Sequence, residues 1–425
     1  MSDMPERIRH ATVRALRWSE KYTKTDMVYL ASVGLWTNLN FVITTALALL
    51  LSVAFANLLP REVYGNYQYL LSLSALLGAI CLTGMGGAVA QSVARGYEGD
   101  LRAGVAAQLW WNLVPTTIGL AGAAYYALHG NGMLAIGLVI IALLAPNINA
   151  FGTYSTFLAG KREFKRSFVY GIVINLAYYA AIFLSIYFFK NATVLIFVNL
   201  AVNLAVTVFF YVRTLRIYAP NDRTDPETIP YGAHLSVMNA FSTIISQLDS
   251  VLVFHFLGPV QLAVYSFATM IPERFGAALN FIGTAAYPKF ANRTLAELRD
   301  TIISKTFRSA LAGAAAALVY VLAAPFLFQL LFPKYLDVIP YTQLYAVIII
   351  LLPANLVSIA LQAQRLKTEL YVTSFVSPIL LITLQIPLLL AYGILGMLVA
   401  RIITDAANVV IGIVLLFRAT HRSAL

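Results

Sequence analysis

Five ionisable side chains interrupt long apolar stretches in the second half of the sequence: Asp249, Glu273, Arg274, Arg401 and Asp405. Ionisable groups in such surroundings are costly, so by default they face partners or a watery cavity. Guanidinium groups suit bidentate contact with phosphate. The two arginines are therefore candidates for binding a diphosphate. The three acids are candidates for balancing those arginines or for binding a coupling cation.

The same side chains also have a structural interpretation, in which they only tie helices together. Arg401 and Asp405 are four residues apart, share one helix face and can form a local ion pair. Glu273 and Arg274 can pair with Asp249 in the same way. The first half of the sequence has no such charge inside its apolar runs, and the sequence leaves both interpretations open.

The composition places the elements that carry these residues in a membrane. Hydrophobic residues make up 60% of the 425 and charged residues 11%, with a mean hydropathy of +0.78. A soluble domain carries roughly 25% charged residues. The formal net charge of +11 comes from basic residues spread over short connectors, which predicts no nucleic-acid partner. The single cysteine excludes an internal disulfide.

The sequence predicts an all-α polytopic membrane protein with twelve spanning helices. A spanning helix needs about 20 mostly apolar residues. The twelve runs that meet this requirement lie at 34–57, 66–90, 104–128, 132–158, 167–188, 192–212, 234–257, 263–288, 305–331, 339–362, 370–391 and 394–417. Alternate connectors hold 24 of the 29 Lys and Arg residues, against 3 in the others. This bias predicts that both termini are cytoplasmic.

A long connector with three prolines and mixed charges divides the chain into two halves. The predicted parts are a basic leader (1–30), a six-helix bundle (31–213), a cytoplasmic linker (214–233), a second six-helix bundle (234–418) and a cytoplasmic tail (419–425). The leader is either an amphipathic helix at the lipid surface or a solvated segment.

The two halves also echo each other in sequence. LLPREVYGNYQYLL (58–71) lies 198 positions before FLGPVQLAVYSFAT (256–269). In each segment, the end of an apolar run is followed by a break, a Tyr and the start of a new apolar run. LLAPN (143–147) resembles LLPAN (351–355) in the corresponding later run. Six helices per half predict parallel repeats related by an axis along the membrane normal.

These motifs resemble the polysaccharide or O-antigen flippases of the multidrug/oligosaccharidyl-lipid/polysaccharide exporter superfamily. The resemblance rests on LGPVQLAVYS (257–266), on LPREVYGNYQYLLS after the first run, and on an Asp in ISQLDSVLVFHFLG (245–258). It implies a V-shaped pair of bundles that flips an undecaprenyl-diphosphate-linked oligosaccharide, as in lipopolysaccharide biosynthesis, to the outer leaflet of a bacterial or archaeal cytoplasmic membrane.

Neutral polar residues offer a second set of candidates for substrate contact. Asn38 and Asn40 in the first run suit sugar hydroxyls, and Asn147 and Asn355 occupy the two similar LLAPN and LLPAN motifs. Hydrogen bonds between helices are the alternative role for such residues. The first run has no acid, whereas multidrug exporters of this superfamily commonly use one there.

Three functions follow from these observations. The first is an ion-coupled flippase, the second a cation-coupled multidrug or small-metabolite antiporter, and the third a membrane glycosyltransferase or polymerase. The third ranks last because every predicted outward connector is about ten residues or fewer. With no nucleotide-binding loop and no His/Cys cluster, the sequence predicts no enzyme, metal site or cofactor beyond a coupling H⁺ or Na⁺. The expected partners are a lipid-linked oligosaccharide and membrane lipids, and the sequence does not identify any protein partner.

Overall fold

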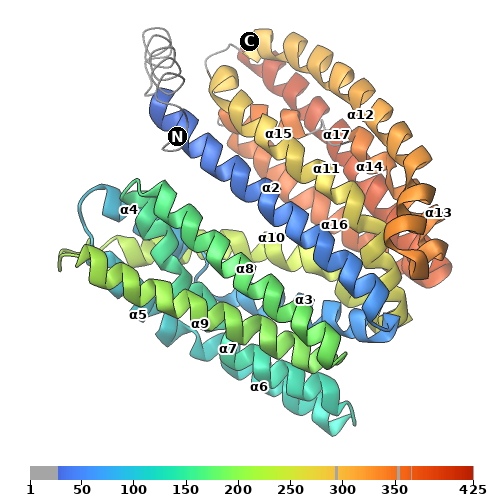
Figure 1. Ribbon diagram of the computed structural model, residues 1–425. Coiled ribbons are helices and arrows are strands. Elements are labelled where there is room, and N and C mark those ends of the chain that lie inside the picture. The colour runs from blue at the N-terminus through green and yellow to red at the C-terminus, as the bar shows by residue number, and fades with distance from the viewer. Residues whose placement is uncertain (1–26, 292–294, 352–354, 365, 425) are drawn as a thin grey trace, which may run out of the picture. The chain divides into compact units, whose positions relative to one another are not determined.

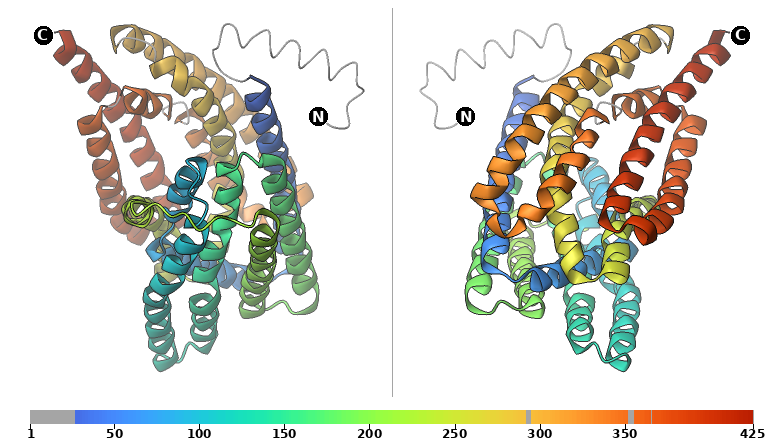
Figure 2. Two further views of the ribbon diagram at one scale, coloured as in Figure 1. Left: turned by 90° about the vertical axis from the view of Figure 1, so that its left-hand side faces the viewer. Right: turned by 90° about the vertical axis from the view of Figure 1, so that its right-hand side faces the viewer.

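A computed structural model describes residues 27–291, 295–351, 355–364 and 366–424, and every element in this part of the chain is a helix (Figures 1 and 2). Most of the predicted leader (1–30) therefore lies outside the described residues. Eight described helices are long and apolar enough to cross a membrane, or nine if one bent pair counts as a single span. The chain is therefore a multi-pass membrane protein.

Contacts between helices divide the chain into two units. Unit 1 comprises residues 1–55 and 73–244, and unit 2 comprises residues 56–72 and 245–425. This division differs from the predicted one at two places, because residues 56–72 group with unit 2 and the start of the seventh predicted run groups with unit 1.

Unit 1 is assembled around α7 (Gly132–Gly160), which contacts α4, α5, α6, α8 and α9. The described helices up to residue 291 are α2 (Met27–Leu58), α3 (Arg61–Ile80), α4 (Met85–Ala94), α5 (Asp100–Trp111), α6 (Leu113–Leu128), α7, α8 (Phe164–Phe188), α9 (Ala192–Tyr218), α10 (Thr228–Leu257) and α11 (Pro259–Ala291). Both units contribute to α2, α3 and α10, whereas α11 belongs to unit 2 alone. A core of buried side chains that includes Met85, Phe157 and Tyr170 holds unit 1 together.

Two of the predicted runs in unit 1 are broken helices. The run at 66–90 is divided into α3 and α4, which meet at a bend of 52°. A Cβ at Gly84 would lie 2.5 Å from Ser236 N, so the break brings the backbone directly against α10. The Trp111 indole donates to Ile80 O (2.8 Å) and satisfies a carbonyl at the end of α3. The run at 104–128 is likewise divided into α5 and α6.

The predicted linker is shorter than expected and is fastened to the loop between α4 and α5. α9 extends to Tyr218 and α10 begins at Thr228. The buried Asp100 carboxylate accepts from Thr228 Oγ1 (2.8 Å) and from the backbone N–H of Asp225 (3.2 Å). Arg95 forms an ion pair with Asp225 at 2.8 Å. The mixed charges that mark this connector in the sequence therefore hold the start of α10 in place.

Unit 2 contains the remaining helices and is held by buried side chains such as Phe290, Ile302 and Leu361. These remaining helices are α12 (Leu295–Leu331), the 3-10 helix η1 (Pro333–Val338), α13 (Ile339–Tyr345), α14 (Val347–Leu351), α15 (Asn355–Ala363), α16 (Lys367–Tyr392) and α17 (Ile394–Ala424). The predicted run at 339–362 is thus divided among α13, α14 and α15. Helices α16 and α17, orange to red in Figures 1 and 2, form a hairpin.

The two echoing motifs contact each other inside unit 2. Tyr69 stacks on Phe254 with ring centroids 3.7 Å apart, and Tyr64 packs on Phe267 at 4.9 Å. A Cβ at Gly65 would lie 1.8 Å from the carbonyl oxygen of Pro259. The motifs that suggested a repeat therefore form a close backbone contact between the start of α3 and the start of α11.

Charged groups at the start of α3 add to this contact. Arg61 forms an ion pair with Asp337 at 2.5 Å, and its guanidinium lies 4.7 Å from the centre of the Tyr335 ring. Lys334 donates to Asn57 O at 2.7 Å. These groups join residues 56–72 to η1.

Candidate functional site

Asp249 is the centre of a buried polar cluster in unit 2. Only 2% of this residue is exposed. Its Oδ2 accepts from the Tyr265 hydroxyl (2.7 Å) and from the Arg401 guanidinium, and its Oδ1 accepts from the Gln385 amide (2.5 Å). A buried carboxylate persists when it is paired and hydrogen-bonded, and Asp249 meets both conditions.

Two glycine turns, one between α10 and α11 and one in the α16–α17 hairpin, bring these four side chains together. Gly258 (φ +84°) separates α10 from α11, and Gly393 (φ +59°) separates α16 from α17. Both conformations favour glycine because a Cβ is strained there. Gln385 and Arg401 stand eight residues before and after Gly393, so the turn places them at the same level of the hairpin.

Arg401 also contacts Glu273, which adds another acid to the cluster. Arg401 Nη2 lies 3.5 Å from Glu273 Oε1, and the Tyr345 hydroxyl lies 3.4 Å from the same oxygen. Arg401 therefore faces two carboxylates with one positive charge. A site with this balance attracts cations more readily than phosphate, because the guanidinium is already neutralised.

The ion pairs differ from those that the structural interpretation of the sequence expected. Asp249 pairs with Arg401, 152 positions away, and not with Arg274. Among the ion pairs of the described residues, none joins Arg401 to Asp405, although Asp405 lies one turn further along α17. A buried partner on a neighbouring helix replaces the local pair. Arg274 is exposed on α11 and does not belong to the cluster.

The asparagine candidates have separate environments. Asn147 donates to Leu143 O (2.9 Å) and accepts from the Asn112 amide (3.3 Å), so it joins helices. Asn40 Oδ1 is buried and has no hydrogen-bond partner in the protein. The side chains of Asn38 and Asn355 lie outside the described residues.

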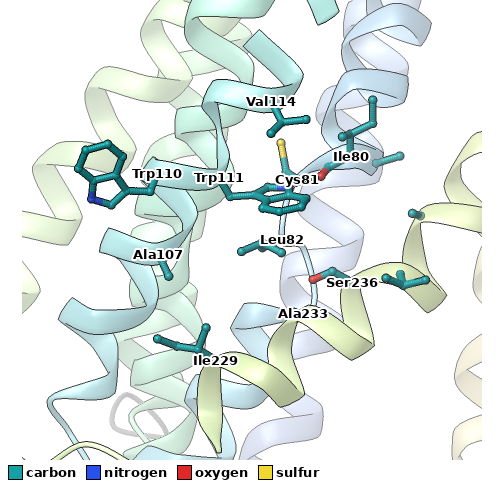
Figure 3. Close-up of a pocket in the computed structure, with 13 residues that line it drawn as sticks. Ile80, Cys81, Leu82, Ala107, Trp110, Trp111, Val114, Ile229, Ala233 and Ser236 are labelled. Atoms are coloured by element: carbon teal, nitrogen blue, oxygen red, sulfur yellow. Dashed lines mark hydrogen bonds between the residues drawn. The ribbon is translucent and has the colours of Figure 1, made fainter. Parts of the chain in front are cut away.

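An apolar pocket of about 650 Å³ lies in unit 1 at the break between α3 and α4 (Figure 3). Its lining includes Leu82 from the break, Val114 from α6 and Ala233 from α10. Trp111 points toward Cys81, whereas Trp110 points away and is 76% exposed. Such a lining suits hydrocarbon and offers little to a sugar or a phosphate.

The amino-acid sequence matches one protein family over most of its length. A family profile described as "Polysaccharide biosynthesis protein" matches residues 31–293. The chain belongs to this polysaccharide biosynthesis family. A search of curated protein sequences gives no match.

Solved structures show which fold this chain shares. An inward-facing MATE-family multidrug resistance transporter of the MOP superfamily has a TM-score of 0.68 at 15% identity, covering 88% of this chain and 94% of its own. The lipid II flippase MurJ has a TM-score of 0.61 at 14% identity, covering 91% and 87%. A MOP superfamily transporter from Pyrococcus furiosus has a TM-score of 0.62 at 14% identity, covering 92% and 95%. The fold is that of these transporters.

Three members of the buried cluster were missed by sequence reasoning: Tyr265, Gln385 and Tyr345. Tyr265 was visible as the Tyr of the LGPVQLAVYS motif, but its hydroxyl had no evident partner. Gln385 stands in an apolar run two residues before Pro387, and a polar amide inside such a run was the signal available. Tyr345 carries no signal that separates it from the other 23 tyrosines.

Proposed function

We propose that this protein flips a polyprenyl-diphosphate-linked oligosaccharide from the cytoplasmic to the outer leaflet by alternating access. The observation that carries the proposal is membership of the polysaccharide biosynthesis family together with the fold of the MOP transporters. MurJ, a lipid II flippase, is one protein with this fold. On this proposal the protein is not an enzyme, the glycan moves through a polar path, and the prenyl chain stays in lipid.

The buried cluster supplies the ion coupling in this proposal. Asp249 and Glu273 face Arg401, which leaves one carboxylate in excess of the guanidinium. Gln385 Oε1 is fully buried and has no partner, so it offers a neutral oxygen beside Asp249. A proton or Na⁺ that binds Asp249 weakens its hold on Arg401. The released guanidinium is then available to a diphosphate.

Arg274 has a complementary role in the proposal. It is the arginine on α11 that remains exposed, next to Glu273 in the sequence. A diphosphate carries more negative charge than one guanidinium balances, so a first contact with Arg274 and a second with Arg401 suit it. Asp405 lies one turn beyond Arg401 on α17, and Asp249 and Glu273 rather than Asp405 balance this arginine in the empty state.

The orientation of the chain can be tested separately. The bias of Lys and Arg residues between alternate connectors places both termini in the cytoplasm under this proposal. A reporter fused after Arg223 is expected to report cytoplasm, and one fused after Lys334 the outer side. Alkaline phosphatase and green fluorescent protein fusions check this. Either result reversed contradicts the twelve-span arrangement.

The flipping proposal predicts a defect that depends on two arginines. A strain lacking the gene should accumulate its lipid-linked glycan on the cytoplasmic face, and the wild-type gene should relieve this. Arg274→Ala and Arg401→Ala should each reduce flipping at least tenfold, because each removes a phosphate contact. Leaflet-specific labelling of the glycan measures the result.

A cation-coupled antiporter is the second candidate, since MATE transporters share the fold. The excess of carboxylates in the cluster suits cation coupling in either case. Normal surface glycan in the deletion strain, with no redundant transporter present, would reject the flippase and favour the antiporter. Loss of resistance to cationic drugs in that strain would support the same conclusion.

A further inference from the structure

A second cavity in unit 1 is lined by a mixture of neutral polar and apolar groups, with many hydroxyls and amides. Its volume is about 500 Å³, which lies in the range of about 300–1,000 Å³ that small-molecule sites occupy. Of its 16 lining residues, 11 carry a hydroxyl or an amide and none carries a charge. The amides come from four helices: Asn40, Gln108, Asn149 and Asn203.

The hydroxyl groups of the lining have used their protons but can still accept hydrogen bonds. Thr156 and Ser155 donate their protons to backbone carbonyls of α7, at 2.8 and 2.9 Å. Thr207 donates to Asn203, and Gln108 donates to Thr153. Each of these hydroxyl oxygens keeps acceptor capacity after its proton is used. The cavity therefore suits a ligand that brings many O–H donors.

One lining residue carries an acceptor without a hydrogen-bond partner in the protein. Asn40 Oδ1 is buried and accepts no hydrogen bond. A buried acceptor without a partner is destabilising, so a ligand or water that reaches this amide stabilises it. The open space lies beside two glycines, because a Cβ at Gly152 or at Gly171 meets no atom within 4 Å. Asn40, Gly152 and Gly171 all line this cavity.

The chemistry of the lining selects among the parts of a lipid-linked glycan. A diphosphate needs cationic partners, and the lining has none. A prenyl chain would leave the amides and hydroxyls without partners. An uncharged sugar satisfies them, because its hydroxyls both donate and accept.

We propose that this cavity binds uncharged sugar residues of the transported glycan. The proposal rests on the flippase function, because it assigns the head group of that substrate to a site. Unit 1 then recognises the sugar by neutral hydrogen bonds, while the charges of unit 2 serve the diphosphate and the coupling ion.

The test introduces larger side chains at two glycines that line the cavity. A Cβ at either position meets no atom within 4 Å, so Gly152→Phe, on α7, and Gly171→Leu, on α8, should each add a side chain beside the open space. Gly132→Phe is the matched control, since Gly132 is also on α7 with open space around it but does not line the cavity. Thermal unfolding identifies any variant that fails to fold, and the second cavity variant then decides.

The probes are maltotriose and chitotriose, followed by saturation-transfer NMR on the purified full chain in a detergent without a sugar head group. The wild type and Gly132→Phe should bind at least one probe, and Gly152→Phe and Gly171→Leu should bind it at least tenfold more weakly. Equal binding by the folded cavity variants would overturn the proposal. Failure of the wild type to bind either neutral probe, or preference for glucose 1-phosphate, would overturn it too.

Flipping in cells separates this inference from the proposed function. If the gene restores flipping to the deletion strain and Gly152→Phe restores it equally well, the cavity is not the sugar site and the flippase proposal stands. If the deletion strain flips its glycan normally, the flippase proposal fails, and probe binding then reports only a sugar-binding cavity.

Discussion

Replacing Arg401 with methionine is expected to destabilise the protein by about 3–5 kcal/mol, because it leaves Asp249 buried without its cation. Asp249 keeps its hydrogen bonds from Tyr265 and Gln385, but neither donor carries a charge. Methionine preserves most of the arginine's apolar packing, so the loss reports the charge. Thermal or steric-trap unfolding of the purified protein measures it.

The double variant Asp249→Asn with Arg401→Met is the control for this prediction. Asparagine is neutral and still has an oxygen to accept from Tyr265, so the double variant should be more stable than Arg401→Met alone. Its flipping should remain at least tenfold below wild type, because the coupling acid is lost. If the destabilisation of the double variant equals the sum of those of Asp249→Asn and Arg401→Met alone, the two side chains do not interact. The cluster then loses its proposed role.

The membrane spans and the charged candidates could be predicted from the sequence for a physical reason. Long apolar runs and biased connectors are determined by lipid, which acts on each segment separately. Asp249 and Arg401 stood out because ionisable groups are rare in such runs. Their pairing could not be predicted from the sequence, because it depends on side-chain contacts between α10 and the α16–α17 hairpin. The sequence also offered a local partner for Arg401 in Asp405.

The neutral cavity was less predictable than the charged cluster. Asn40 was a candidate because a neutral amide in the first run suits sugar hydroxyls, but Thr153, Thr156 and Thr207 carry no comparable signal. Threonine and serine are common in membrane helices, where they bond to the preceding turn or to a neighbouring helix. Only the packing of α7 beside α8 and α9 gathers them around one space.

Gly65→Ala is expected to have the second large effect, at a position where no charge is involved. The new Cβ would lie 1.8 Å from Pro259 O and 2.5 Å from Pro259 C, both backbone atoms. Neither can rotate away, so the starts of α3 and α11 must separate. That displacement would also loosen the stacking of Tyr69 on Phe254. Overpacking of this kind costs about 1–3 kcal/mol, and thermal unfolding measures it.

Gly78→Ala, in the same helix, isolates the effect of the close contact. A Cβ at Gly78 meets only the Asn149 amide nitrogen, at an ordinary 3.6 Å. Alanine is favoured over glycine inside a helix by roughly 0.5–1 kcal/mol, so this variant should be neutral or slightly stabilised. The two variants add the same atom to α3 and should shift stability in opposite directions. Equal stability for both would mean that α3 and α11 do not approach at Gly65, and that the echoing motifs do not form the contact that joins residues 56–72 to unit 2.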